Sequence, residues 1–227
     1  MNLRALLSVS AIALSAFAAV VAHGAVVIVT STAALGVTDH TDWTTLGGPL
    51  TQVPSPISTS TTGGRAFTAT TANGGNFSRL EEGGVTWGGN FALHSAVLWN
   101  RGQGAVTFSF ASPVRGAGMQ FNSDFIGDFT ARIEAFTSGD VSLGAFTRDG
   151  HTERTFDNTA IFLGFLSDSS DVSKFTVSFT AAPGDSVNDF AISDVSINAV
   201  PEPSTWAVVS GGALLVFAGW RRHSVKA

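Results

Sequence analysis

Alternation of apolar and polar residues with a period of two dominates the second half of this 227-residue chain. In Phe129–Ala135 the apolar side chains fall on every second position, and the pattern recurs in Val106–Phe110 and Phe175–Phe179. Successive side chains of a β-strand point to opposite faces of a sheet, so these runs predict strands with one buried face. Ile161–Leu166 is apolar throughout, which suits a strand buried on both faces.

Turn signals separate the predicted strands. Residues 138–140 (Ser-Gly-Asp) predict a hairpin, Pro113 is expected to end the run before it, and Val26–Val29 fits a first short strand. The Thr-, Ser- and Gly-rich segment 55–75 is expected to form edge strands and loops rather than core. With no amphipathic helix of useful length between the strands, the sequence predicts an all-β fold: a two-sheet antiparallel sandwich of jelly-roll type.

The last predicted strand changes phase along its length. Phe190 and Ile192 share one face, whereas Val195 and Ile197 share the other. A slip of one residue moves every following side chain to the opposite face of a sheet. A β-bulge is therefore predicted near residues 193–194.

The first 24 residues have the features of a secretory signal peptide. Arg4 supplies a positive charge, and residues 5–21 are apolar except for three serines. Small residues then precede a predicted cleavage between Gly24 and Ala25. The alternative is a retained N-terminal membrane anchor.

A second apolar segment, residues 206–220, lies near the C-terminus and contains no charge. As a helix it would span roughly 22 Å, short of the ~30 Å hydrocarbon core. A predicted helix over residues 204–220, with Arg221 and Arg222 snorkelling at its end, brings the segment closer to a full membrane span. The positive-inside rule then places the basic tail 221–227 in the cytoplasm. A buried core helix is disfavoured because polar residues at helical spacing are missing.

Val200, Pro201, Glu202, Pro203 and Ser204 stand directly before this segment. Two prolines so close together end the sandwich and start the anchor. The order of VPEPS box, apolar helix and arginine pair at a C-terminus resembles the PEP-CTERM sorting domain of Gram-negative bacteria that make exopolysaccharide. The resemblance implies that an exosortase, a multi-spanning membrane enzyme, recognises the box and cuts or transfers the chain there. The alternative is a simple anchor with a proline hinge.

The sequence thus divides into a signal peptide (1–24), a β-sandwich ectodomain (25–199) and a sorting and anchor segment (200–227). The stretch from 42 to 200 also resembles an uncharacterised β-sandwich ectodomain that recurs in PEP-CTERM proteins, which implies fold and export but no activity. That likeness is carried by residues 127–131, 133–136 and 189–192. The expected route is export, transient anchoring in the inner membrane, and then the cell surface, outer membrane or extracellular matrix.

Charge and cysteine content exclude several function classes. Residues 25–199 hold 16 acidic and 8 basic residues, a net charge of −8. Nucleic-acid binding needs a basic footprint, so no nucleic-acid partner is expected. The absence of cysteine excludes disulfides, thiolate metal sites and cysteine nucleophiles.

Catalytic signatures are also missing. Glycosidases need two carboxyl groups about 5–10 Å apart, and the neighbours Glu81 and Glu82 would face opposite sides of a strand. No G-x-S-x-G motif occurs, and His151 is expected in a polar loop without a partner motif. No catalytic residue is therefore predicted, and the chain is not expected to be an enzyme.

Two ligand hypotheses remain for the ectodomain. No cofactor is expected, except that Asp185, Asp189 and Asp194 could supply oxygen ligands to a structural Ca²⁺; the alternative is that they are solubilising acids.

Trp43, Trp87 and Trp99 are candidate carbohydrate contacts, since an exposed indole can pack on a sugar face. Trp87 stands between glycine pairs that leave it room to be exposed, although a tryptophan in such a position is more often a core or rim residue. The leading interpretation is a structural or interaction protein of the surface or exopolysaccharide matrix. The alternatives are a carbohydrate-binding module and an extracellular hydrolase.

Overall fold

The computed structural model describes residues 24–83, 86–181 and 188–199. The predicted sorting box at 200–204, Arg221, Arg222 and all of the signal segment before Gly24 lie outside these residues. Within the described ranges, no helix is both long enough and apolar enough to cross a membrane. The predicted flanking helices therefore stay predictions.

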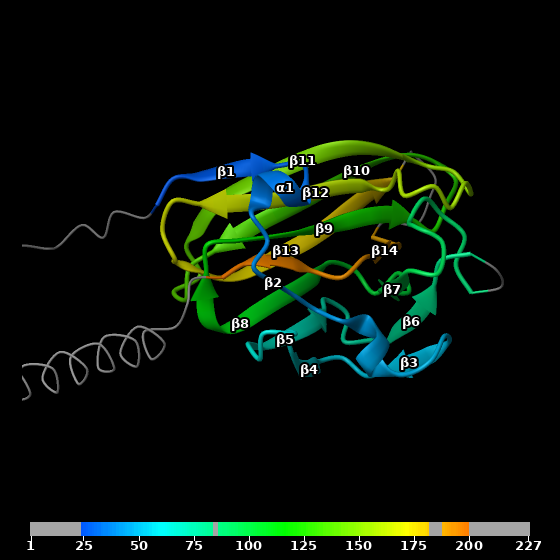
Figure 1. Ribbon diagram of the computed structural model, residues 1–227, viewed down its shortest axis with the longest axis horizontal. Coiled ribbons are helices and arrows are strands. Elements are labelled where there is room, and N and C mark those ends of the chain that lie inside the picture. The colour runs from blue at the N-terminus through cyan, green and yellow to red at the C-terminus, as the bar shows by residue number, and fades with distance from the viewer. Residues whose placement is uncertain (1–23, 84–85, 182–187, 200–227) are drawn as a thin grey trace, which may run out of the picture.

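The described residues are mostly β-strand, with a single α-helical turn and a single 3-10 turn (Figure 1). The strands are β1 (Val26–Val29), β2 (Asp39–His40), β3 (Thr51–Val53), β4 (Ile57–Ser60), β5 (Ala66–Thr71), β6 (Phe77–Glu81), β7 (Ala96–Trp99), β8 (Val106–Val114), β9 (Gly116–Ser123), β10 (Gly127–Phe136), β11 (Ser142–Thr152), β12 (Ile161–Ser167), β13 (Val172–Ala181), β14 (Phe190–Ile192) and β15 (Ser196–Asn198). The helical turns are α1 (Thr32–Leu35), which follows β1, and η1 (Trp43–Leu46), which follows β2.

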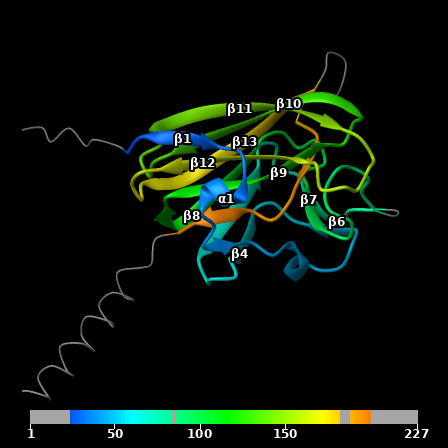
Figure 2. The same cartoon turned by 45° about the horizontal axis from the view of Figure 1, so that its top comes forward.

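The strands form two antiparallel sheets that pack face to face (Figures 1 and 2). One sheet has nine strands in the order β1-β12-β9-β14-β7-β6-β3, with β15 pairing β9 and β2. The other has six strands in the order β11-β10-β13-β8-β5-β4. The prediction of an all-β fold with two antiparallel sheets is confirmed.

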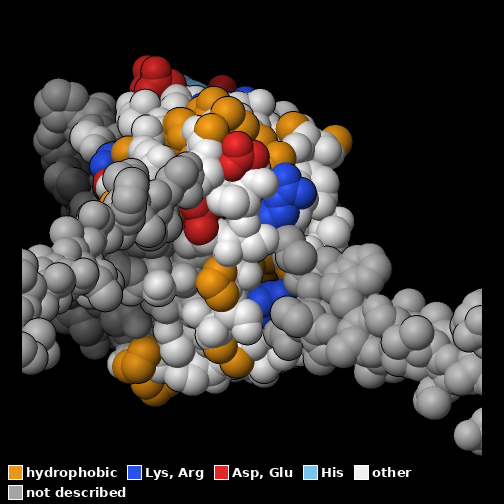
Figure 3. Space-filling model, turned by 90° about the vertical axis from the view of Figure 1, so that its left-hand side faces the viewer, with side chains coloured by type: hydrophobic (Ala, Val, Ile, Leu, Met, Phe, Trp, Pro, Cys, Tyr) orange, Lys and Arg blue, Asp and Glu red, His pale blue; other side chains and the backbone are white. Residues whose placement is uncertain are grey.

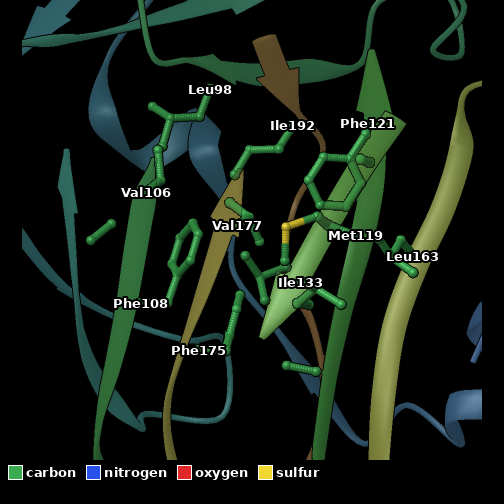
Figure 4. Close-up of a cluster of buried hydrophobic side chains, with 14 of the residues drawn as sticks. Leu98, Val106, Phe108, Met119, Phe121, Ile133, Leu163, Phe175, Val177 and Ile192 are labelled. Carbon is green, nitrogen blue, oxygen red and sulfur yellow. The ribbon is translucent and has the colours of Figure 1, made fainter. Parts of the chain in front are cut away.

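The main core lies between the inner faces of the two sheets. Phe129, Ile133 and their alternate neighbours on β10 are buried in it, as the period-two pattern predicted. Phe108 of β8 stacks on Phe175 of β13 with ring centroids 4.8 Å apart (Figure 4). Each such side chain stabilises the fold by about 1.5–3 kcal/mol through burial. The core is therefore built largely from phenylalanine on alternating positions.

Two details of the predicted strand pattern were wrong. β8 continues through Pro113 to Val114, because the proline falls where the pairing with β13 is irregular and no ladder donor is needed. The segment 55–75 is not confined to edges: β5 lies between β4 and β8, and its Phe67 and Ala69 are fully buried. Two apolar side chains on alternate positions were enough to place it in the core.

The predicted bulge in the last strand is confirmed. β14 and β15 both pair with β9, Phe190 opposite Ser123 and Ile197 opposite Ala117. From Phe190 to Ile197 the chain advances seven residues, whereas β9 advances six from Ala117 to Ser123. One extra residue is therefore inserted between β14 and β15. The insertion brings both out-of-phase apolar pairs into the same core.

The outer face of the nine-stranded sheet is covered in two places. Near β1 and β12, Leu35 of α1 packs with Val29 and Phe162. Over β6 and β7, residues 86–95 bury Trp87 and Phe91 in a second small cluster. The surface between these two covers stays open and forms a pocket.

Candidate functional site

A pocket of about 570 Å³ lies on the outer face of the nine-stranded sheet, between its two covers. This volume is in the range typical of small-molecule sites. Hydroxyl and amide side chains make up most of its lining, with one arginine, one carboxylate and a few apolar groups. The lining residues are Thr30, Ser31, Thr32, Ser95, Ala96, Gln120, Arg148, Asn158, Thr159, Ala160, Ile161, Phe162, Ser193, Asp194 and Ser196.

Gln120 and Phe162 form the centre of the pocket floor, opposite each other on β9 and β12. The Gln120 amide nitrogen donates to Asn158 Oδ1 (3.0 Å) and to the Ala160 carbonyl (3.1 Å). With both amide hydrogens engaged, its oxygen is fixed as an acceptor at the floor. An apolar ring beside an oriented amide is a surface that can take both the carbon face and the hydroxyls of a polar ligand.

The β-bulge supplies one wall. Ser193 Oγ accepts from the main-chain nitrogen of Gln120 (2.9 Å), and Ser193 N donates to the Gln120 carbonyl (3.2 Å). The next residue, Asp194, accepts from Trp43 N (2.8 Å) and from the Thr41 hydroxyl (3.5 Å). Burial raises the pKa of Asp194 to about 6. The bulge thus places a hydroxyl and a partly buried carboxyl side by side at the pocket.

Arg148 reaches the pocket from the other sheet. It lies on β11, and its Nη1 donates to the carbonyls of Phe162 (2.6 Å) and Thr30 (3.2 Å). Pairing between β1 and β12 stops at Val29 and Gly164. The guanidinium therefore occupies the place where β1 leaves β12, and it bonds two carbonyls there.

None of the three candidate tryptophans lines the pocket. Trp43 is 1% exposed and Trp87 is 5% exposed, so neither offers a ring face to a sugar. The flanking glycines leave room for Trp87 but do not expose it, because its ring packs over Leu80 and against Trp99 at 6.2 Å. Half-buried Trp99 donates through Nε1 to Asp189 (2.6 Å) and faces the guanidinium of Arg101.

The predicted calcium ligands are bound to different partners. Asp189 accepts from Trp99, whereas Asp194 accepts from Trp43 and Thr41. Asp185 falls in 182–187, outside the described residues. Across the ranges that the structure describes, no group of three His, Asp or Glu side chains is placed to hold a metal ion.

His151 does not lie in a loop, as predicted, but on β11, since that strand is longer than its apolar part. Its Nδ1 is 2.6 Å from Asp128 Oδ1 on β10, away from the pocket lining. Glu81 and Glu82 differ from each other in burial. Glu81 is partly exposed, whereas Glu82 is fully buried and its carboxylate accepts three main-chain N–H groups. These acids and histidines do not converge on one site.

Sequence reasoning missed Gln120, Arg148 and Phe162. The first is the single polar residue in an otherwise apolar strand segment, which was the one local signal available. Arg148 and Phe162 belong to different sheets and become neighbours only through tertiary packing. Only Asp194 of the sequence-predicted residues lines the pocket.

The surface viewed from the left of Figure 1 differs from the pocket. There, apolar side chains form separate patches, with acidic and basic side chains between them (Figure 3). A docking face for a protein partner usually has one larger contiguous apolar patch. The pocket is therefore the stronger candidate for a site.

Comparison with known proteins gives distant structural neighbours. No protein-family profile matches the chain, and no curated protein matches it. A DUF4465 family protein from Bacteroides caccae has a TM-score of 0.43 at 7% identity, over 69% of this chain and 96% of that one. CsCBM6-3 from Clostridium stercorarium, solved with cellobiose, has a TM-score of 0.32 at 8% identity, over 68% of this chain and 99% of that one.

A third neighbour is the C-terminal family 22 carbohydrate-binding module of Clostridium thermocellum Xyn10B. Its TM-score is 0.24 at 14% identity, over 74% of this chain and 98% of that one. Likeness at this level carries neither a ligand nor an activity over to this chain.

Proposed function

We propose that this chain is an exported, non-enzymatic surface protein whose β-sandwich binds a saccharide in the pocket between its two covers. The observation that carries the proposal is the lining itself. Hydroxyls and amides can match the many donors and acceptors of a sugar, and the Phe162 ring supplies an apolar contact. This proposal corresponds to the carbohydrate-binding alternative from the sequence. The proposed contact residues are those of the pocket rather than the three tryptophans.

Hydrolysis is less well supported than binding. Glycoside cleavage needs two carboxyl groups flanking the bond. Asp194 is the one acid in the described lining of the pocket. Its neighbour Ser193 is bonded to Gln120 rather than to a histidine. The arrangement is suited to holding a ligand and lacks a pair of groups to cleave it.

The sorting proposal rests on the sequence. The VPEPS box at 200–204 and the arginine pair that follows support recognition by an exosortase, after transient anchoring in the inner membrane of a Gram-negative bacterium. The intact mass and the C-terminal peptide of the protein recovered from its host's surface fraction test this. A chain that begins near Ala25 and ends near Pro201 supports it. A tail retained through Ala227 contradicts it.

Two variants within one helical turn test the pocket. Thr32 lines it, whereas the next residue, Ala33, is exposed and does not. In the full chain, Thr32→Trp should fill the pocket, while Ala33→Trp should add the same bulk outside it. Binding to a glycan array is the measurement. A saccharide that binds the wild type and Ala33→Trp equally, and Thr32→Trp at least roughly tenfold more weakly, supports the proposal. Equal binding by all three proteins contradicts it.

A further inference from the structure

Arg148 is a cation without a carboxylate partner among the described residues. Arg132 pairs with Glu134, and Lys174 pairs with Asp140. Arg148 instead bonds two main-chain carbonyls, both through Nη1. Arg148 is also the one basic side chain in the described lining of the pocket.

The two carbonyl bonds leave part of the guanidinium available. Both hydrogens of Nη1 are used, so Nε and Nη2 keep three N–H donors with no described partner. These donors belong to a side chain that lines the pocket and is half-buried. Anchoring through Nη1 also fixes the plane of the guanidinium, which lowers the entropy lost when it binds a ligand.

We infer that the saccharide bound in this pocket carries a carboxylate, as a uronic acid does, and that Arg148 receives it through Nε and Nη2. A planar guanidinium binds a carboxylate with two parallel hydrogen bonds, and such charge-assisted pairs are the strong ones. This inference rests on the proposed function, and it names the ligand class that the pocket prefers.

Asp194 on the bulge constrains how such a ligand lies. A second carboxyl group beside the ligand's carboxylate would repel it. The uronate group is therefore placed at Arg148, and the sugar hydroxyls at Asp194, Ser193 and Gln120. The opposite charges of Arg148 and Asp194 therefore favour one orientation of an acidic saccharide in the pocket.

The test compares uronic acid oligosaccharides with the same oligosaccharides after chemical reduction of their carboxyl groups. Calorimetric titration of the full wild-type chain should show at least roughly tenfold tighter binding of the acidic form. Arg148→Gln should abolish that preference. Arg132→Gln removes one positive charge from a residue outside the pocket lining and should leave the preference unchanged. Arg148→Lys keeps a charge but loses the planar fork, so it should restore the preference only in part.

The outcomes separate this inference from the proposed function. Equal binding of acidic and reduced oligosaccharides by the wild type overturns the inference and leaves saccharide binding standing. A preference that survives in a folded Arg148→Gln variant also overturns it, because another group would then receive the carboxylate. Failure to bind any saccharide overturns the proposed function itself. The wild-type comparison needs no variant, so it stands even if Arg148→Gln does not fold.

Discussion

The main-chain nitrogen of Trp43 donates a hydrogen bond of 2.8 Å to the carboxylate of Asp194, which lies 151 residues further along the chain. The Trp43 indole Nε1 also donates to the Ser193 carbonyl at 2.9 Å. One residue from η1 therefore holds both residues of the bulge that lines the pocket. A tryptophan that the sequence suggested as a ligand contact instead supports the pocket from behind.

Trp43→Phe should lower the free energy of unfolding by about 1–3 kcal/mol, because it removes the bond to Ser193 and part of a buried ring. It should also weaken saccharide binding, since the bulge loses one of its supports. Chemical denaturation and calorimetric titration measure the two effects.

Trp99→Phe is the matched control for this change. It also removes an indole hydrogen bond, the one to Asp189, but Trp99 is outside the pocket lining. It should destabilise the fold without weakening binding. If both variants reduce stability and neither changes affinity, Trp43 does not position the bulge for the ligand.

Asp194→Asn should change how stability depends on pH. Burial raises the pKa of Asp194 to about 6, and the charge of Asp42 acts in the same direction. The hydrogen bonds from Trp43 and Thr41 and the charge of His40 oppose that rise. The folded state therefore binds this proton more readily than the unfolded state, whose carboxyl has its ordinary pKa of 3.8.

A raised carboxyl pKa makes the fold more stable as the pH falls from about 7 to about 4. Over that range the wild type should gain on the order of 1–3 kcal/mol relative to Asp194→Asn. Asp39 and Asp42 have lowered pKa values and act in the opposite direction, but they are common to both proteins. Denaturation curves at a series of pH values give the difference. Parallel pH profiles would contradict a titration of Asp194 in this range.

Trp87→Ala should cost about 3–5 kcal/mol of stability, as expected for a large aromatic residue removed from a core. The ring is 5% exposed and packs in the cluster with Leu80 and Phe91. Leu93→Ala is the control, because Leu93 is 54% exposed and should change stability by no more than about 0.5 kcal/mol. A Trp87→Ala protein of unchanged stability that no longer binds saccharide would restore Trp87 as a sugar contact.

Glu82→Gln should loosen the cover that carries Trp87. The buried carboxylate accepts from the nitrogens of Gly89 (2.8 Å), Phe91 (3.0 Å) and Gly83 (3.2 Å). An amide in its place turns an NH₂ group toward N–H donors, at a cost of about 1–3 kcal/mol.

In the Glu82→Gln protein, hydrogen exchange should be accelerated relative to the wild type, and more so in residues 86–95 than in β10. Glu81→Gln removes the same charge at a partly exposed neighbour but keeps an oxygen for the 3.2 Å contact with His94 Nδ1, so it should accelerate exchange in that segment less than Glu82→Gln does. Equal protection in both variants would mean that the cover is held by its apolar contacts alone.

The sequence by itself determined the elements whose signal is local. Alternation in β10 and β13 identified their buried faces, because side chains of a strand point to opposite faces whatever lies across from them. The change of phase between Ile192 and Val195 identified the bulge for the same reason.

Tertiary structure decided the rest, because the site depends on contacts between distant segments. Whether Trp43 and Trp87 were exposed depended on what packed against them, and no neighbouring residue encoded that. The pocket joins Thr32, Gln120, Arg148 and Asp194 from both sheets and from the two ends of the described chain. Taken alone, each of these residues resembles an ordinary exposed polar residue of a strand or turn. Only the meeting of two sheet edges and one bulge makes them a site.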